Sequence, residues 1–413
     1  MPEHYDLLLR GGTLVLPWGE EVADAGVRGG RIAALGVPGG ATADQVVQAA
    51  GLHVLPGLID PHVHLRDPGD PAIESIPTGT RAAVLGGLAA VFDMPNTAPS
   101  ITSAGQVAWK QRYVEQAAWC DMGLYVGATK GNTGQLAALE QEAGVCGVKV
   151  FAGSSTGDLL IEDDASLEAV MRHGRRRVSY HSEDEYRLQA RKPLFKLGDP
   201  YSSHMEWRDE ECAFLGTRRL MALARKTGRP AHILHVSTAQ ELEYVAGYRD
   251  VATVELLVNH LTQVAPEVYE QLGGMGVMNP PIRGRRHYEA AWAAVQDGTA
   301  DTIGSDHAPH TREEKARPYP ASPSGMPGVQ TLVPVMLDHV AAGRLSLARM
   351  VDLTCAGPRQ IEDRWIVSPC GWTPFDGMRV TGWPMATVVR GHVVMQDDEA
   401  LGSPVGRLVR FGG

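Results

Sequence analysis

The sequence has few cysteines and no long apolar segment. Its five cysteines, at positions 120, 146, 212, 355 and 370, are odd in number and far apart. This usage argues against a disulfide framework and predicts reduced thiols in a cytoplasmic protein. No apolar run reaches the roughly 18 residues of a transmembrane helix. The first residues have neither the basic nor the apolar region of a signal peptide, so we expect no membrane partner.

The sequence also lacks an excess of positive charge. Its 38 Lys and Arg stand against 48 Asp and Glu, which gives a net charge of −10 with neutral histidine. A nucleic-acid-binding domain needs a basic face, so this balance argues against a nucleic-acid partner. Hydrophobic residues make up 44% of the 413 residues, enough for a large core. The 15 histidines suggest metal chemistry, which only their positions can decide.

Both ends of the chain have the pattern of short strands and turns. Residues 5–10, 22–27, 31–35 and 46–54 predict a small antiparallel unit, and 386–390 with 392–396 predict a strand pair around Gly391. We expect the two ends to build one β-sandwich. The predicted domains are therefore a small β-sandwich from residues 1–53 and 366–413 and a central domain from residues 54–365.

The central region alternates apolar strands with helical stretches. Helical patterns cover 134–142, 166–173 and 210–226. Eight strands are expected, at 57–65, 88–94, 122–128, 145–151, 178–181, 232–236, 252–258 and 301–305. This alternation predicts a parallel sheet, and eight such units predict a (β/α)₈ barrel of the TIM type. In that fold the catalytic groups lie at the carboxyl ends of the strands.

Two histidines close the first barrel strand. His62 and His64 are two residues apart, a spacing that places both side chains on one face of a strand. Inside a barrel, both imidazoles would reach one metal ion. The ordinary alternative is two unrelated polar residues at a strand end.

Other strand ends carry further ligand types. Lys149 lies in an apolar strand, where it either reaches solvent at the strand end or is carboxylated by CO₂ to become an anionic oxygen ligand. His181, His235 and Asp306 end the fifth, sixth and eighth strands. His232 is three residues from His235 and should point the opposite way. Nitrogen and oxygen ligands without cysteine predict two divalent ions, best suited to zinc, with Asp306 also moving a proton.

Six motifs in one order along the chain carry a family resemblance. They are GLIDPHVHLRDPG (57–69), MPNT (94–97), GVKVF (147–151), LHVST (234–238), MNPP (278–281) and SDHAPH (305–310). On these motifs the sequence resembles the cyclic amidohydrolases of the amidohydrolase superfamily, and most of all the dihydroorotase family. The resemblance implies one metal on His62, His64 and Asp306, a second on His181 and His235, and carboxylated Lys149 bridging them.

The same resemblance implies a substrate. Arg66, Asn96 and His310 match the family positions that bind a ring carboxylate, and Asn279 matches the residue that hydrogen-bonds the pyrimidine ring. The expected reaction is the reversible interconversion of L-dihydroorotate plus water and N-carbamoyl-L-aspartate in de novo pyrimidine biosynthesis. The ordinary alternative for Arg66 is an ion pair with a neighbouring aspartate, at position 67 or 70.

Other functions remain open. A hydantoinase, dihydropyrimidinase or allantoinase would share the metal ligands, and a non-catalytic subunit would share only the fold. Ser155, in a G-x-S-x-G pattern, would serve a serine hydrolase. Residues 311–328 are expected either to close over the substrate or to form a mobile connection. Relatives usually have a longer segment near residues 358–362. The family also implies a homo-oligomer, a dimer or tetramer.

Overall fold

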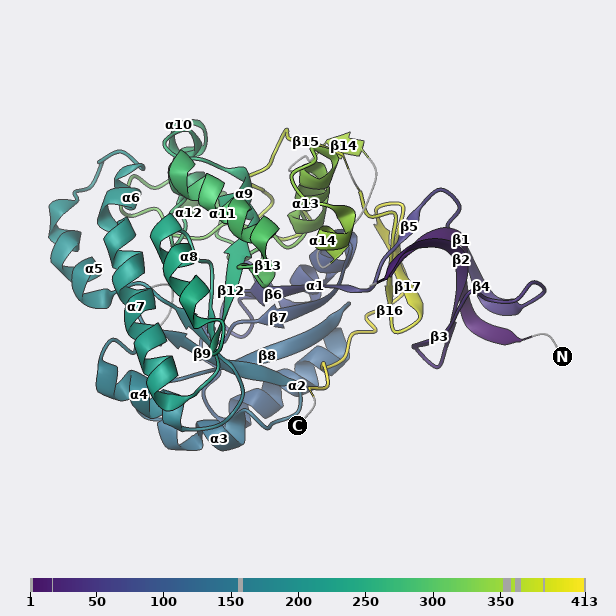
Figure 1. The fold of residues 1–413 in the computed structure, drawn as a ribbon, viewed down its shortest axis with the longest axis horizontal. Coiled ribbons are helices and arrows are strands. Elements are labelled where there is room, and N and C mark those ends of the chain that lie inside the picture. Colours follow the sequence, from purple (N-terminus) through teal and green to yellow (C-terminus); the bar gives the residue numbers. More distant parts are fainter. Residues whose placement is uncertain are drawn as a thin grey trace.

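The computed structural model describes residues 3–16, 18–154, 159–351, 358–360, 365–381 and 383–411. A barrel of strands and helices forms the larger part, and a sheet from the N-terminal residues extends from one side (Figure 1). The fold class predicted from the sequence, a TIM-type barrel with a small β region from both termini, is confirmed.

The barrel wall is a parallel sheet of eight strands in the order β13-β12-β11-β10-β9-β8-β7-β6. Every predicted strand is present, with ends that differ by a few residues. The strands are β6 (Leu58–Val63), β7 (Leu88–Asp93), β8 (Asp121–Gly127), β9 (Val145–Phe151), β10 (Val178–His181), β11 (Ala231–Ile233), β12 (Ala252–Leu257) and β13 (Thr302–Gly304).

A buried carboxylate joins the first barrel strand to the last. Asp60 on β6 accepts hydrogen bonds from the backbone N–H of Ser305 at 3.1 Å and of His62 at 3.2 Å. The backbone N–H of His64 donates to the carbonyl of His307 at 2.7 Å. Burial raises the pKa of Asp60 to about 6, although these hydrogen bonds lower it. The closure places the two histidines of β6 beside the residues that follow β13.

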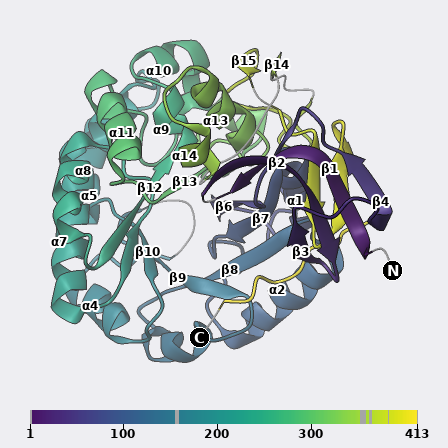
Figure 2. The ribbon, with the colours of Figure 1, turned by 45° about the vertical axis from the view of Figure 1, so that its right-hand side comes forward.

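Helices surround the barrel (Figure 2). The longer ones are α1 (Ile76–Leu85), α2 (Ala104–Ala117), α4 (Asp164–Arg172), α7 (Glu210–Thr227), α8 (Ala239–Val245), α11 (Arg285–Asp297) and α13 (Leu332–Ala341). Shorter ones are α3 (Leu136–Leu139), α5 (Glu185–Arg191), α6 (Ser203–Trp207), α9 (Val258–Thr262), α10 (Glu267–Leu272), α12 (Arg312–Lys315) and α14 (Leu347–Val351).

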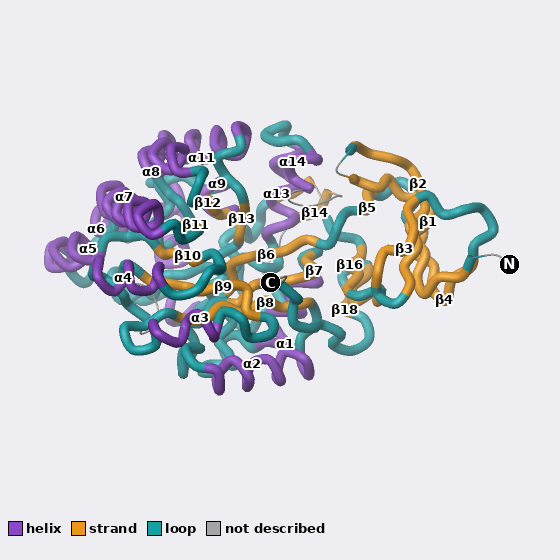
Figure 3. The backbone as a smooth tube through the Cα atoms, turned by 60° about the horizontal axis from the view of Figure 1, so that its bottom comes forward, coloured by secondary structure: helices purple, strands orange, loops and turns teal. Residues whose placement is uncertain are grey.

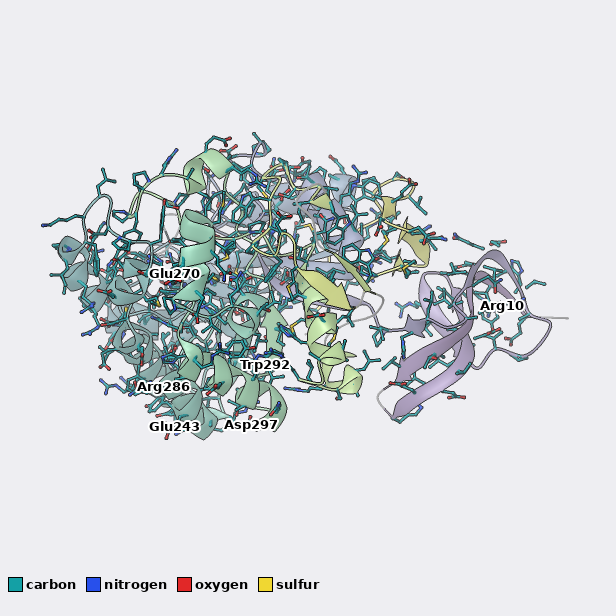
Figure 4. All side chains as sticks on the ribbon, turned by 90° about the horizontal axis from the view of Figure 1, so that it is seen from above. Arg10, Glu243, Glu270, Arg286, Trp292 and Asp297 are labelled. Carbon is teal, nitrogen blue, oxygen red and sulfur yellow. The ribbon has the colours of Figure 1, made fainter. Side chains whose placement is uncertain are left out.

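Capping residues in the sequence explain where several helices begin. Asp163, Asp209 and Ser75 each accept a backbone N–H at the start of a helix, as N-caps do. On α11, Arg286 and Asp297 lie at the outer edge in Figure 4, whereas Trp292 is buried against the barrel. The helix expected over 134–142 is wrong in length, because a 3₁₀ turn at Thr133–Gln135 leaves only the four residues of α3.

The N-terminal sheet is mixed, which corrects the antiparallel unit expected from the sequence. It contains β1 (His4–Leu16), β2 (Gly19–Arg28), β3 (Arg31–Leu35), β4 (Thr42–Gln48) and β5 (His53–Val54). β1 pairs antiparallel with β2 but parallel with β4 and β5. The reason is that the chain crosses over after β3 and returns on the other side of β1, running in the same direction.

The C-terminal strands form sheets of their own. They are β16 (Ala386–Val389), β17 (His392–Gln396) and β18 (Glu399–Ala400) in one antiparallel sheet, and β14 (Pro358–Gln360) with β15 (Arg379–Thr381) in another. Val393 of β17 packs with Leu7 and Val27 of the N-terminal sheet. On the other side, the Thr387 hydroxyl donates to the carbonyl of Val84 on α1. The β16–β18 sheet therefore lies between the N-terminal sheet and the barrel (Figure 3).

Two sequence expectations fall on undescribed parts of the chain. Ser155 lies outside the described residues, and so do residues 361 and 362 of the segment 358–362, whose first three residues form β14. Among the helices of the described ranges, none has the length and apolar character needed to span a membrane.

Candidate metal centre and substrate site

Side chains from four strands converge at one end of the barrel. The Nε2 atoms of His62 and His64 lie 3.2 and 3.0 Å from Oδ1 of Asp306. The rings of His62 and His235 have centroids 5.4 Å apart, and those of His181 and His235 4.7 Å. Ligand atoms of His62, His235 and Asp306 all lie within 4.8 Å of one another, a possible three-residue metal site.

Two of these residues have unusual backbone geometry. His235 has a φ of 41° and Asp306 a φ of 48°, in the left-handed region that non-glycine residues rarely adopt. Such conformations cost of order 1–3 kcal/mol and are frequent at functional sites. The sequence argument that His232 and His235 point in opposite directions assumed one continuous strand. Because β11 ends at Ile233, that alternation does not reach His235. The side chain of His232 approaches Glu255, with Nε2 3.9 Å from Oε2, whereas the ring of His235 lies beside His181 and His62.

Glu255, which was not predicted from the sequence, accepts hydrogen bonds from two of these histidines. Its Oε1 accepts from Nδ1 of His62 at 2.7 Å and from the backbone N–H of His235 at 3.1 Å. Burial raises the pKa of Glu255, but its interactions with His62 and His232 lower that pKa by more. The net pKa is therefore below the ordinary value for a glutamate. An anionic carboxylate on Nδ1 leaves Nε2 of His62 to face the centre, as in metal-binding histidines. The sequence did contain a signal for this role, because Glu255 is the one charged residue of an otherwise largely apolar strand.

Two further histidines are also held by polar partners. Nδ1 of His64 donates to the amide oxygen of Asn96 at 2.6 Å. Nε2 of His181 donates to Glu183 at 2.9 Å, and Glu183 forms a buried ion pair with Arg208. The sequence interpretation named neither Glu183 nor Arg208. Each of these two rings therefore has one nitrogen committed to an oxygen, which fixes which nitrogen faces the centre.

Lys149 is fully buried, which excludes the solvent-exposed strand-end lysine that the sequence left open. Its side chain has 0% exposure, and Nζ has no hydrogen-bond partner among the described residues. Burial lowers the pKa of the amine to about 7, against the attraction of Asp306 and Glu255. The closest ring contact is Phe151, with Nζ 4.6 Å from the ring centroid. A substantial part of the amine is therefore neutral and nucleophilic near neutral pH.

The donor set fits a divalent metal. Within the described residues, Nε2 of His62, Nδ1 of His235 and Nζ of Lys149 are buried atoms without a hydrogen-bond partner. Native proteins rarely leave such buried polar atoms unsatisfied. Together with the close approach of ligand atoms from His62, His235 and Asp306, they indicate a place for a ligand. Imidazole and carboxylate groups without thiolates suit zinc and related ions.

Arg66 lies beside this cluster. Its Nε and Nη2 donate to the carbonyl of Pro309 at 3.3 and 3.0 Å. Among the described residues no carboxylate lies within ion-pair distance of Arg66, so the predicted alternative of a pair with Asp67 or Asp70 is not formed. Burial lowers the pKa of the guanidinium, while Asp306 is the largest opposing charge. The site thus contains a cation able to accept an anionic ligand.

The other predicted substrate residues lie on nearby loops. Asn96 uses its amide oxygen to accept from Nδ1 of His64 at 2.6 Å. Nε2 of His310 donates to the carbonyl of Ser324 at 3.2 Å, and burial lowers the pKa of that ring to about 3. The amide oxygen of Asn279 accepts from Nε2 of His204 at 2.9 Å, a contact the sequence did not suggest.

His307 supports Asp306 rather than joining the cluster. Its Nε2 donates to Glu74 at 3.1 Å, and its Nδ1 accepts from the backbone N–H of Gly328 at 3.1 Å. Glu74 also accepts from the hydroxyl of Ser368, in the segment that leads to the C-terminal strands. This chain of contacts fixes the backbone next to Asp306.

Comparison with known proteins agrees with this geometry. A profile of the family described as dihydro-orotase-like matches residues 51–152. The dihydroorotase of Methanosarcina acetivorans is 31% identical, over 88% of this chain and 86% of the relative. The allantoinase of Deinococcus radiodurans is 32% identical, over 98% of each chain. The structure of an L-hydantoinase (dihydropyrimidinase) from Arthrobacter aurescens superposes with a TM-score of 0.92 at 24% identity, over 98% of this chain and 100% of that chain, and shows the shared fold.

The relatives place the chain in a class, the metal-dependent amidohydrolases of cyclic amides, and the barrel with its ligand cluster agrees with that class. Within that class the relatives above determine the placement. The chain belongs to the dihydroorotase-like family.

Proposed function

We propose that this chain is a dihydroorotase, which interconverts L-dihydroorotate plus water and N-carbamoyl-L-aspartate in de novo pyrimidine biosynthesis. The observation that carries the proposal is Arg66, a guanidinium beside the ligand cluster that is paired only with a backbone carbonyl among the described residues. Of the cyclic amides considered, dihydroorotate alone carries a ring carboxylate. Guanidinium groups bind carboxylates through paired, charge-assisted hydrogen bonds.

The proposed cofactor is a pair of zinc ions. His62, His64 and Asp306 would hold one ion, and His181 with His235 the other. Lys149 would bridge them as a carbamate, formed when its neutral amine attacks CO₂, makes an N–C bond and releases a proton. Burial of Lys149 and its lowered pKa support this step. When bound, such ions activate water and polarise a carbonyl at neutral pH.

The side chains have separate tasks in ring opening. Asp306 accepts the proton of the attacking water on its carboxylate and delivers it to the leaving ring nitrogen. Arg66 and Asn96 hold the substrate carboxylate, and Asn279 orients the ring. His310 is neutral and carries one N–H, now used on Ser324. It must exchange that bond for the substrate carboxylate when the substrate binds.

One assay tests the proposal. Turnover of L-dihydroorotate is measured beside dihydrouracil, hydantoin and allantoin, before metal stripping, after it, and after return of zinc with bicarbonate. Turnover of dihydroorotate alone, lost on stripping and regained with zinc, is the expected result. Turnover of a neutral ring would keep the metal centre and overturn the roles of Arg66, Asn96 and His310. No metal-dependent turnover of any ring would sink the proposal.

The second candidate function is allantoinase. It is favoured by the Deinococcus radiodurans relative, which matches 98% of each chain. Hydantoinase or dihydropyrimidinase activity would use the same fold, and the panel of substrates separates all of them. A non-catalytic subunit is disfavoured by the intact convergence of the cluster. A serine hydrolase using Ser155 would keep its activity after metal stripping.

Three further expectations belong with this proposal. The chain would divide into a domain of residues 1–53 and 366–413 and a barrel domain of residues 54–365. It would act in the cytoplasm on a small-molecule substrate, without nucleic-acid or membrane partners. It would form a homo-oligomer, a dimer or tetramer, which sedimentation at several concentrations would test against a monomer.

A further inference from the structure

A buried lysine without a counter-ion lies in the loop that follows β13. Lys315 ends α12, and its side chain has 0% exposure. Its Nζ donates to the backbone carbonyls of Val277 and Pro323, each at 2.8 Å. Among the described residues no carboxylate lies within ion-pair distance of it. A buried lysine is unfavourable unless its donors are satisfied. The two carbonyls satisfy the Lys315 nitrogen and so stabilise its buried position.

The two carbonyls belong to the two loops of the substrate site. Val277 is two residues before Asn279, and it also accepts the backbone N–H of Gly325 at 3.0 Å. Pro323 precedes Ser324, whose carbonyl receives the N–H of His310. The Nζ of Lys315 therefore connects the segment that carries Asn279 to the segment that supports His310.

Backbone packing between the same loops is an independent observation. A Cβ added at Gly274 would lie 2.0 Å from the carbonyl oxygen of Lys315, so the turn Gly273–Gly276 lies directly against α12. The hydroxyl of Ser322 donates to the same carbonyl at 3.0 Å. The indole of Trp372 donates to the carbonyl of His310 at 2.8 Å. The loop after β13 is thus fixed on several sides, which differs from a loosely attached connection.

We propose that Lys315 is a positioning residue for substrate binding, whose side-chain nitrogen sets the spacing between the loops that carry Asn279 and His310. The proposal rests on the proposed function, because it takes those two residues as substrate contacts. Lys315 lies outside the ligand cluster, so its loss should weaken binding of the ring without removing the metal. Because removing the Lys315 side-chain nitrogen takes away two buried hydrogen bonds that join the loops, a measurable rise in KM is the expected consequence.

The principal test replaces Lys315 by Met, which keeps the length of the side chain but removes the donors. We expect Lys315→Met to raise KM about tenfold or more, with kcat reduced less than about threefold and metal content unchanged. Lys315→Arg, which keeps the charge and donors, should recover part of the KM. Lys130→Met, at an exposed lysine on the barrel surface, is the matched control and should behave as the native protein.

A second variant disturbs the same spacing from the other side. Gly274→Ala places a methyl group against the carbonyl of Lys315 and should produce the same rise in KM at nearly constant kcat. The idea is overturned if KM stays native in Lys315→Met. It is equally overturned if kcat and metal content fall together with a rise in KM, since that is the result of a general structural defect.

Hydrogen exchange separates this inference from the proposed function. Lys315→Met should speed amide exchange in residues 273–281 and 318–328 together, by about tenfold or more, while the barrel strands keep native rates. This readout needs no substrate. If the native enzyme turns over another cyclic amide, the proposed function fails but exchange and the KM for that substrate still test Lys315. Native exchange in both segments overturns the inference whichever substrate is used.

Discussion

The two sides of the site are built in different ways. On the proposed metal side, His62, His64 and His181 lie at strand ends and are fixed by side-chain oxygens, such as those of Glu255. On the proposed substrate side, Arg66 and His310 donate to backbone carbonyls of loops. Carboxylates hold His62 and His181, whereas the carbonyls that accept from Arg66 and His310 are neutral partners that a substrate anion could replace. The histidines of the proposed metal side are therefore already oriented. The donors of the proposed substrate side can exchange a backbone carbonyl for the carboxylate of a substrate.

The largest effect is expected on the metal side. Asp306→Asn removes the carboxylate that faces both His62 and His64 and takes away the proton acceptor. We expect kcat to fall by roughly a thousandfold or more. Steady-state kinetics measures it, with Asp44→Asn, an exposed carboxylate in the N-terminal sheet, as control. Retention of more than a tenth of native kcat would contradict the role of Asp306.

The next largest effect is expected from a substitution that alters the proposed substrate side and leaves the proposed metal side intact. Arg66→Met should lower kcat/KM for dihydroorotate by about a hundredfold or more, because charge-assisted hydrogen bonds to the carboxylate are lost. Metal content, measured by elemental analysis, should remain native. Arg81→Met, at an exposed position on α1, serves as control. If the metal were lost as well, the two sides would not be separable in the way described.

A smaller effect tests how the metal side is supported. Glu255→Gln keeps the shape of the side chain but removes the anion that accepts from His62. Metal affinity should weaken about ten- to hundredfold, as measured by competition with a chelator of known affinity. Glu243→Gln on α8, on the outer surface, is the matched variant. Equal affinities in the two variants would show that Glu255 does not support the metal.

The smallest effect on turnover concerns a histidine outside the site. Burial lowers the pKa of His339 to about 4. Between pH 6.5 and about 4 the unfolded chain binds a proton there and the folded protein does not, so stability falls as the pH falls. From pH 6.5 to 5 this loss is roughly 2 kcal/mol.

His339→Gln should remove that part of the pH dependence. Urea unfolding of the two proteins at pH 7.5 and 5.0 measures it, and the native protein should lose more stability between the two pH values. Kinetics at pH 7.5 should be unchanged, because His339 contacts Thr262 and not the ligand cluster. An identical pH dependence in both proteins would show that His339 titrates in the folded state as it does in the unfolded chain.

Much of the site could be predicted because its residues stand where apolar strands end. His62 and His64 follow the two-residue period of a strand, and Asp306 follows a short apolar run, so local pattern placed them. Glu255 was missed although it gave the same signal as Lys149, a charge within an apolar strand. Lys315 and Glu74 could not be found this way, because they lie in loops whose composition resembles solvent-exposed sequence.

The sequence by itself determined the barrel, since strand and helix periodicities are local, and it determined which residue types meet at the strand ends. Only the tertiary structure decided which nitrogen of each histidine faces the centre, because His62 and Glu255 are 193 residues apart. It also decided the left-handed backbone at His235 and Asp306, the parallel pairing of β1 with β4, and the buried amine of Lys315. These features depend on burial and on partners distant in the chain, which no local pattern specifies.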